Sequence, residues 1–278
     1  MSSRLRSWRA LAATIAACLA LLTATVGPVA AITDGTPDGN GHPYVGLMTA
    51  HAEDGDYLWR CSGTLITSTV FVTAGHCTFG ADYAVIYFDA GPIIPDSDFT
   101  LDTRSCVGIE GYPCGGGVTG SVYTHPQYDD NAFFLFDLGV VVLDEPVNLS
   151  QYGELPELGA LDDFAVGTRF TSVGYGLQKS YPDAAAWKNV GIRERLVAHP
   201  RLLQIDTGFT GDFSILLSNN TKTGGTCFGD SGGPNFIGST NVLAGVTSYG
   251  LNPTCGGTGG VYRLDQADDL EWLATFLD

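Results

Sequence analysis

Short apolar runs recur along the chain, and each is separated from the next by Gly, Pro, Asn or Asp. The runs are YVGLMTA, CSGTLITSTVFVTA, YAVIYF, GVVVL, RFTSVGYG, LLQIDTGF, FSILLS, VLAGVTSYG and GGVYRL. They are rich in Val, Ile, Phe, Tyr and Thr, which favour strands, whereas the residues between them favour turns. With 37 Gly residues and no long helical pattern, the chain is predicted to be all-β, built from antiparallel barrels or sandwiches.

Two segments depart from this strand pattern. Residues 143–167 carry two Pro and many acids with no clear period, and we expect them to cross between two halves of the chain. The final segment, LDQADDLEWLATFLD, predicts a helix, because its apolar residues recur at helical spacing, at Leu270, Leu273, Phe276 and Leu277. Asp265 is the expected cap of this helix, and the apolar stripe is expected to pack on the core.

The start of the chain has the order of a secretory signal peptide. Arg4, Arg6 and Arg9 precede an apolar run over about residues 11–26, and small residues follow in VAA. The run is short for a membrane anchor and no second apolar stretch follows, so cleavage and export are the favoured interpretation. We therefore expect a secreted protein from which residues 1–31 are removed, with no membrane association afterwards.

Acidic residues dominate the charge of the chain. It has 13 Lys and Arg residues against 30 Asp and Glu residues, a formal net charge of −17, and three of the Arg residues lie in the predicted signal. The mature chain would therefore carry ten basic residues and a net charge near −20. Such a surface repels nucleic acid, so no nucleic-acid partner is expected.

Cysteine usage predicts disulfides. Cys18 lies in the predicted signal, and an even set of six remains: Cys61, Cys77, Cys106, Cys114, Cys227 and Cys255. Such a set in an exported chain favours three disulfides, although the count alone permits many pairings. A metal site is disfavoured, because no C-x-x-C pair occurs and His76–Cys77 has no convincing partners.

The stretch GDSGGP, residues 229–234, places Ser231 in a turn that suits a nucleophile. A serine hydroxyl needs a histidine base, which in turn needs a carboxylate to orient it. Read as G-x-S-x-G, the stretch would be the nucleophile elbow of an α/β-hydrolase, whose histidine follows the serine. All five histidines precede Ser231, which excludes that interpretation; they are His42, His51, His76, His125 and His199.

Three segments fit the opposite order of His, Asp and Ser. FVTAGHC around His76, FDLGVVVLDEPV with Asp137 and GDSGGP with Ser231 resemble the chymotrypsin-like serine proteases, and the resemblance spans essentially the whole mature chain. It implies that His76 is the general base, that Asp137 orients it and that Ser231 attacks the substrate. It also implies an oxyanion hole formed by the N–H groups of Gly229 and Ser231.

The other acids and histidines have weaker contexts. Asp129 and Asp130 are alternative acids, but they lie in a polar turn rather than at the start of an apolar strand. His125, beside a Pro, is expected to be a surface loop residue. The remaining histidines have no motif around them and are expected to be exposed or structural; they are His42, His51 and His199.

The same resemblance implies a substrate pocket. Gly225 would lie at its base, followed by Thr226, and Phe228 would lie at its rim. Gly250 and Gly260 would occupy the wall positions where larger side chains block entry. Since the base carries no carboxylate, the pocket should accept a large apolar or aromatic side chain rather than Lys or Arg.

TSYG resembles the strand that lines the substrate cleft in this family. Ser248 would support the Asp137 carboxylate, Tyr249 would lie in the cleft, and Gly250 would pair with the substrate backbone. The resemblance also implies particular disulfides. These are Cys61–Cys77 beside the base and Cys227–Cys255 bracing the pocket, which leaves Cys106 and Cys114 for each other.

Activation is implied by the segment that follows the predicted signal. In the resembled proteases, a new N-terminal Ile or Val forms an ion pair with the Asp before the nucleophile, which is Asp230 here. ITDG, starting at Ile32, resembles that N-terminal segment. We therefore expect cleavage after Ala31 to expose Ile32 and to yield active enzyme without a separate pro-peptide.

The expected fold is two antiparallel six-stranded β-barrels with a C-terminal α-helix. Residues 32–150 would form the first barrel, which carries His76 and Asp137, and residues 151–278 the crossing, the second barrel with Ser231, and the helix. The sequence predicts a secreted serine endopeptidase that acts on peptide or protein substrates. A non-catalytic binding protein on the same fold and a narrow-specificity processing protease are the alternatives.

No metal or organic cofactor is expected. Asp89, Asp96 and Asp98 cluster in a segment that could hold calcium, but a solvated acidic loop is the favoured interpretation. Asn148 and Asn219 begin glycosylation motifs, which matter only in a eukaryotic secretory pathway.

Overall fold

The computed structural model of the chain describes residues 32–91, 93 and 117–277. The predicted signal peptide lies outside these residues. So do the predicted pair Cys106–Cys114 and two acids of the candidate calcium cluster, Asp96 and Asp98.

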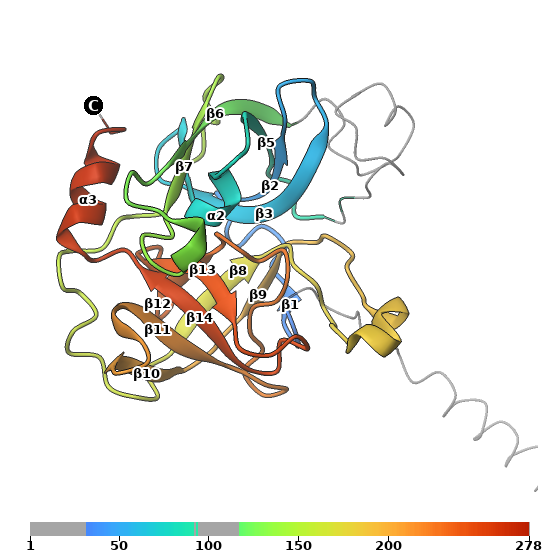
Figure 1. Cartoon of the computed structure of the whole chain (residues 1–278), viewed down its shortest axis with the longest axis vertical. Coiled ribbons are helices and arrows are strands. Elements are labelled where there is room, and N and C mark those ends of the chain that lie inside the picture. Colours follow the sequence, from blue (N-terminus) through green and yellow to red (C-terminus); the bar gives the residue numbers. More distant parts are fainter. Residues whose placement is uncertain (1–31, 92, 94–116, 278) are drawn as a thin grey trace, which may run out of the picture.

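The first half of the described chain forms a closed six-stranded barrel in the order β2-β3-β4-β7-β6-β5 (Figure 1). Its strands are β2 (Val45–His51), β3 (Tyr57–Leu65), β4 (Val70–Thr73), β5 (Tyr83–Tyr87), β6 (Val118–Thr124) and β7 (Gly139–Leu143). Neighbouring strands are antiparallel throughout, and β5 closes the barrel by pairing with β2. Every residue of β2 is buried, because this strand pairs on both sides and packs on the core. The predicted first barrel is confirmed.

The second half forms a sheet of eight strands in the order β1-β9-β8-β12-β13-β14-β11-β10. Its strands are β1 (Thr36–Pro37), β8 (Phe170–Gly174), β9 (Leu196–Ala198), β10 (Leu202–Thr207), β11 (Gly211–Asn219), β12 (Pro234–Ile237), β13 (Leu243–Gly250) and β14 (Gly257–Arg263). The sheet therefore has more strands than the six expected, and β1 and β10 lie at its ends. The added strand β1 comes from the start of the described chain, ahead of the first barrel, and pairs with β9.

The helices within residues 32–91 and 117–277 are short, as the strand-rich pattern predicted. They are α2 (Gly75–Thr78), the 3-10 turns η1 (Asp130–Ala132) and η2 (Asp183–Lys188), and the predicted C-terminal helix α3 (Ala267–Ala274). Leu273 of α3 is fully buried, whereas Leu277, past its end, is exposed. The helix begins one residue later than expected: Gln266 is its N-cap, and Asp265 is instead buried in an ion pair with Arg263. No described helix is long and apolar enough to span a membrane.

One apolar core joins the two halves. It contains Val45 and Val72 of the first barrel, Val173 and Phe236 of the second sheet, and Leu273 of α3. Burial shared in this way fixes the halves against each other, because separating them would expose the shared surface to water.

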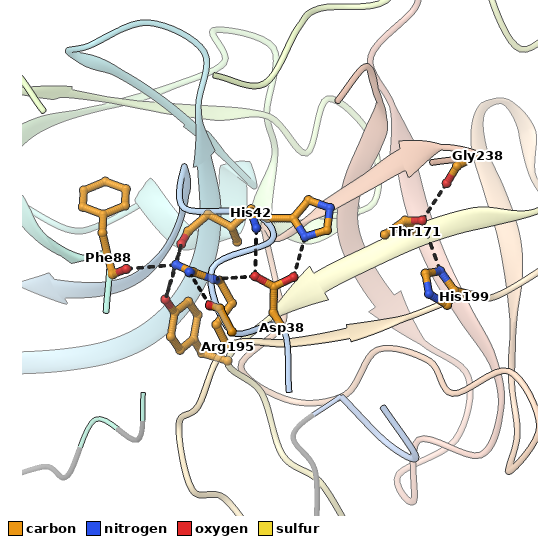
Figure 2. A network of polar contacts seen from close by, with 10 residues as sticks. Asp38, His42, Phe88, Thr171, Arg195, His199 and Gly238 are labelled. Atoms are coloured by element: carbon orange, nitrogen blue, oxygen red, sulfur yellow. Dashed lines mark hydrogen bonds and ion pairs between the residues drawn. The ribbon is translucent and has the colours of Figure 1, made fainter. Parts of the chain in front are cut away.

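A buried arginine fastens the N-terminal segment to both halves (Figure 2). Arg195 is fully buried, and its Nε donates to Asp38 Oδ2 at 3.0 Å. Its Nη1 donates to the carbonyls of Val45 and Phe88 at 3.1 and 2.9 Å. Asp38 also accepts the backbone N–H of His42 at 2.9 Å. The network therefore links the chain just after Ile32 to the barrel and to the strand β9 that follows Arg195.

Candidate active site

His76 and Asp137, far apart in the sequence, meet at the end of the first barrel. His76 lies in α2, directly after β4, and Asp137 lies two residues before β7, which pairs with β4. Asp137 Oδ1 accepts the backbone N–H of His76 at 2.8 Å, and Oδ2 lies 2.9 Å from His76 Nδ1. Ser248 of β13 donates to the same Oδ2 at 2.6 Å. The carboxylate is fully buried and held by three donors from two elements.

A glycine allows this close approach. FVTAGHC carries Gly75 where the resembled family has Ala, and a Cβ at that position would lie 2.9 Å from the Tyr128 ring and 3.0 Å from the Leu138 backbone nitrogen. Contacts this short would require the Tyr128 ring or the Leu138 backbone to shift, so glycine lets α2 lie directly against the segment that carries Asp137 without that adjustment. Phe136, just before Asp137, has a φ of 51° and turns the chain into the site.

The electrostatics suit a histidine that changes charge near neutral pH. Burial lowers the pKa of His76, but the charge of Asp137 and its hydrogen bond raise it, and the net direction is upward from 6.5. A quarter of the His76 side chain remains exposed, while Asp137 is closed off from solvent. The Nδ1 contact with a carboxylate favours the tautomer with its proton on Nδ1, which leaves Nε2 free to accept a proton.

The turn that carries Ser231 is packed against β3 and β4. The backbone N–H of Ser62 donates to the Ser231 carbonyl at 2.8 Å, and the Ser62 hydroxyl donates to the Gly229 carbonyl at 2.9 Å. Gly232 has a φ of 75°, and a Cβ there would lie 2.0 Å from the hydroxyl of Thr73. Because Thr73 ends β4 and α2 follows it, this packing sets the serine turn beside the helix of His76.

Within residues 229–233 of the serine turn, the N–H groups of Gly229 and Ser231 have no hydrogen-bond acceptor in the described chain. The intervening Asp230 N–H donates to the Cys227 carbonyl, and the Gly232 N–H donates to the Thr247 carbonyl. Gly229 and Ser231 are also partly exposed, whereas Asp230 and Gly232 are buried. Two free donors on one turn form a natural site for an anionic oxygen.

No hydrogen bond joins the Ser231 hydroxyl to His76 among the described residues. Such contacts are often long without substrate and shorten when it binds. Phe133, whose ring centre is 6.4 Å from that of His76, lines the same cavity as Ser231.

Asp230 is fully buried beneath the serine turn. Its Oδ1 accepts the Gly176 N–H and its Oδ2 accepts the Cys227 N–H, each at 2.8 Å. Burial nevertheless raises the pKa of Asp230 to about 7, against the opposing effect of these bonds and of the Arg60 charge. Ile32 is buried too, against Leu196 and Ala198.

The first residues of the described chain run beside the segment that precedes the nucleophile. Thr33 forms an antiparallel bridge with Gly225, and the Gly225 N–H donates to the Thr33 carbonyl at 3.1 Å. The segment after the predicted cleavage point is thereby held beside Gly225, which lies six residues upstream of Ser231 and five upstream of Asp230.

A cavity of about 290 Å³ opens beside Ser231. It is lined by Phe133, Thr226, Cys227, Phe228, Ser231, Thr247, Ser248, Tyr249, Gly250, Asn252, Cys255 and Thr258. None of these described lining residues carries a charge. The cavity thus brings together five of the residues singled out for the pocket and cleft: Thr226, Phe228, Ser248, Tyr249 and Gly250.

Gly225 and Gly260 do not line this cavity. A Cβ on Gly260 would lie 2.3 Å from the ring of Tyr249, so that ring occupies the space where the sequence suggested an open wall. A Cβ on Gly225 would lie 2.4 Å from the side chain of Asn219. Both glycines are covered, and their lack of a side chain serves packing around the cavity rather than entry into it.

Asn219 is the residue that covers Gly225, and the only sequence motif at this position is a glycosylation motif. It is 2 % exposed, its Nδ2 donates to the Thr226 carbonyl at 2.8 Å, and its Oδ1 accepts the Thr33 hydroxyl at 2.5 Å. The amide is therefore used inside the fold. It ties the N-terminal segment to the chain that leads into the serine turn.

A second, apolar cavity of about 280 Å³ shares Phe133, Tyr249 and Gly250 with the first. Its other lining residues are Phe134, Phe209, Phe213 and Leu251. These side chains come from separate parts of the chain, with Phe213 in β11 and the others in loops, which is why no single stretch of sequence pointed to them.

Two disulfides flank the site. Cys61–Cys77 joins β3 to α2 beside His76, and Cys227–Cys255 joins the segment just before the serine turn to the loop between β13 and β14 across the cavity. In the described part of the chain, Cys61, His76 and Cys77 are the one cluster with atoms close enough for a metal. Both of its sulfurs are bonded to each other, so it is not available as a ligand set.

The expectation that His125 is a surface residue is wrong. It is 4 % exposed, its ring stacks on Phe136 at 5.2 Å, and Trp272 of α3 packs edge-on at 5.0 Å. Burial lowers the pKa of His125 against the opposing charge of Asp268, and the buried Asp269 carboxylate lies 3.9 Å from its Nε2. A histidine beside a proline gives no hint of this in the sequence, because the covering groups come from the C-terminal helix.

Comparison with known proteins agrees with this geometry. A family model described as Trypsin matches residues 33–267. A trypsin from Saccharopolyspora erythraea is 31% identical over 238 residues, covering 80% of this chain and 87% of the relative. A chymotrypsin from Phaedon cochleariae is 27% identical and covers 84% of this chain and 77% of its own length.

Solved structures share the fold at lower identity. The structure titled HL collagenase superposes with a TM-score of 0.65 at 21% identity, covering 88% of this chain and 98% of its own. Human heparin binding protein superposes with a TM-score of 0.61 at 22% identity, covering 88% and 96%. The family match spans most of the sequence and includes the segments that carry His76, Asp137 and Ser231. The chain therefore belongs to the trypsin family of serine proteases.

Proposed function

We propose that this chain is a secreted serine endopeptidase in which Ser231, His76 and Asp137 form the catalytic triad. The observation that carries the proposal is the buried Asp137 carboxylate: its Oδ2 accepts the Ser248 hydroxyl, its Oδ1 accepts the His76 backbone N–H, and the His76 ring Nδ1 contacts both oxygens. Burying a charged carboxylate costs free energy, and the fold by itself does not require such a group at this position. The carboxylate lies behind the partly exposed His76, and the cavity lined by Ser231 is nearby. This arrangement suits general-base catalysis by His76.

The chemistry follows from these positions. As Ser231 attacks the scissile carbonyl, His76 Nε2 takes the hydroxyl proton, and Asp137 stabilises the imidazolium through Nδ1. The free N–H groups of Gly229 and Ser231 receive the oxygen of the tetrahedral intermediate. His76 then donates its proton to the leaving amine, and water hydrolyses the acyl-enzyme by the same steps in reverse.

The cavity beside Ser231 supports a preference for large apolar or aromatic side chains before the scissile bond. Its described walls offer aromatic rings, a disulfide and hydroxyl groups, but no carboxylate that would attract Lys or Arg. At about 290 Å³ the cavity has room for such a side chain. Phe228 and Phe133 contribute apolar surface at the opening.

Activation would depend on a free amine at Ile32. Cleavage after Ala31 would place this amine at the head of a segment that is already bridged to Gly225 and packed on Leu196. Asp230 is a buried acid with a raised pKa, because its hydrogen bonds and the Arg60 charge only partly compensate its burial. An ion pair between the two groups would stabilise the serine turn. The two disulfides support export to an oxidising compartment.

Cleavage-site mapping tests the proposal. The secreted protein and its Ser231→Ala variant are incubated with a mixed peptide library, and the products are identified by mass spectrometry. Loss of the nucleophile should remove about 10⁴- to 10⁶-fold of the rate. Cleavage after Phe, Tyr, Leu or Met that vanishes in the variant is the expected result.

Other outcomes separate the remaining possibilities. Cleavage after Lys or Arg keeps the triad and contradicts the preference for apolar side chains. Cleavage that persists in Ser231→Ala contradicts the assigned nucleophile. A correctly processed protein that cleaves nothing would be a binding protein on this fold or a protease with a narrow target.

A further inference from the structure

Arg60 stands beside the proposed oxyanion hole. It lies in β3, two residues before Ser62, whose hydroxyl holds the Gly229 carbonyl at 2.9 Å. A Cβ built on Gly229 would lie 3.0 Å from Arg60 Nε and 3.3 Å from its Nη2. Arg60 is not among the residues that line the cavity beside Ser231. The guanidinium group therefore flanks the serine turn outside the cavity proposed for the side chain before the scissile bond.

Tyr57, in the same strand, interacts electrostatically with this guanidinium, and further neighbours of the group belong to the second half of the chain. A Cβ on Gly191 would lie 3.9 Å from Arg60 Nη2 and 2.8 Å from a methyl group of Leu177. The Leu177 N–H donates to the Phe228 carbonyl at 2.8 Å, so this loop is fastened to the serine turn. The cation thus lies between two segments that are fixed relative to Ser231.

No acid of the described chain neutralises this cation. The Arg60 side chain forms no hydrogen bond and no ion pair within 4.0 Å among the described residues. Asp230 acts on it electrostatically, but that carboxylate is fully buried and already accepts two backbone N–H groups. The Arg60 side chain remains partly exposed. A largely covered charge without a partner favours binding of an external anion.

The orientation of the bound substrate chain decides which of its residues pass Arg60. The side chain before the scissile bond enters the cavity, and the leaving amine must lie toward His76, which protonates it. His76 adjoins Cys77, whose disulfide to Cys61 places β3 on that side of the serine. Arg60 immediately precedes Cys61. The residues after the scissile bond therefore extend over β3 and its guanidinium group.

We propose that Arg60 is a specificity-determining residue that binds a carboxylate side chain, Asp or Glu, at the first or second position after the scissile bond. The inference rests on the proposed endopeptidase function. The rest of the surface makes the preference selective, because a chain with a net charge of −17 repels acidic segments elsewhere. An acidic substrate would then bind in the one alignment that places its Asp or Glu carboxylate on Arg60.

The test uses pairs of quenched fluorescent peptides with Phe before the scissile bond. Within each pair, Glu is exchanged for Gln at the first or the second position after that bond. The ratio of kcat/KM for Glu over Gln is measured for the wild type, Arg60→Gln, Arg60→Lys and Arg169→Gln. Arg169 is exposed on the second half of the chain, so its variant removes the same charge from a remote place.

The wild type should prefer Glu by about 3- to 10-fold at low salt, as for a partly desolvated charge pair. The ratio should fall to about one in Arg60→Gln and stay at the wild-type value in Arg169→Gln. Arg60→Lys should give an intermediate ratio, because an ammonium group lacks the two-point geometry of a guanidinium group. In 1 M salt, where the Debye length is about 3 Å, the preference should shrink.

Each comparison is a ratio within one enzyme preparation, so a smaller folded fraction of Arg60→Gln does not alter it. Should that variant not fold, Arg60→Lys carries the test alone. Equal rates on Glu and Gln peptides in the wild type would overturn the proposal, and so would an unchanged ratio in the Arg60 variants or an equal loss in Arg169→Gln. An enzyme that cleaves neither peptide and whose Ser231 is not acylated would instead overturn the proposed function, and the inference with it.

Discussion

Replacing Ser248 by Ala removes one of the three donors that hold the Asp137 carboxylate. The Ser248 hydroxyl is 2.6 Å from Asp137 Oδ2, the residue is 6 % exposed, and Asp137 is fully buried. Water therefore does not replace the lost donor readily. Without it, the carboxylate is free to rotate away from the Nδ1 atom of His76, which it now contacts at 2.9 Å.

The magnitude follows from the charge of the acceptor. A hydrogen bond to a charged group contributes about 1.5–3 kcal/mol, and about 1.4 kcal/mol corresponds to a factor of ten in rate. We expect kcat/KM of Ser248→Ala to fall about 10- to 100-fold, mainly through kcat, since the imidazolium forms only along the reaction path.

The assay measures kcat and KM on an apolar peptide, with the enzyme concentration set by active-site titration. Ser172→Ala is the matched control: Ser172 is fully buried and donates to Asn235 Oδ1 at 2.5 Å, but it does not contact the triad. That variant should lose thermal stability and keep kcat within about twofold of the wild type. A Ser248→Ala enzyme with wild-type kcat/KM would refute the argument that this hydroxyl positions the carboxylate.

Three further predictions concern charge and burial. The pH profile of kcat/KM should rise as His76 loses its proton, with a midpoint above 6.5, because Asp137 raises the pKa of His76 more than burial lowers it; a midpoint below 6 would contradict this balance. In the uncleaved precursor, Asp230 has its pKa raised from 3.8 to about 7, so the precursor should lose stability as pH rises through that window. Thermal unfolding of the precursor should show this decline, Asp230→Asn should reduce it, and an identical decline in both proteins would count against the buried charge. Arg195→Met should destabilise the fold by about 3–5 kcal/mol, because it leaves the buried Asp38 without its guanidinium partner. Urea unfolding checks this, and a loss below about 1 kcal/mol would show that the network of Figure 2 is dispensable.

The sequence predicted the features that depend on local pattern. Strands such as β2 and β7 are short apolar runs bounded by turns, and the apolar stripe around Leu273 marks the C-terminal helix. His76 and Asp137 could be named because each sits in a recognisable stretch next to a buried strand. Their contact required the fold, since 61 residues separate them.

Features that depend on distant contacts could not be read from the chain. β6 alternates apolar residues with Gly, Ser and Thr, and the three-residue β9 is too short for a pattern, so neither was among the predicted strands. His125 looked exposed because its cover comes from α3. No motif marked Arg60, and Asn219 lay only in a glycosylation motif, so only the packing of the serine turn brings them to the site.

The most direct measurement of the central claim is covalent labelling of the nucleophile. The processed enzyme is treated with a sulfonyl fluoride, and the intact mass and the labelled peptide are determined by mass spectrometry. We predict one adduct per chain, located on Ser231, formed faster as pH rises through the pKa of His76 and lost in His76→Ala. Labelling at another residue, or labelling of Ser231 at the same rate in His76→Ala, would contradict the proposed catalytic site.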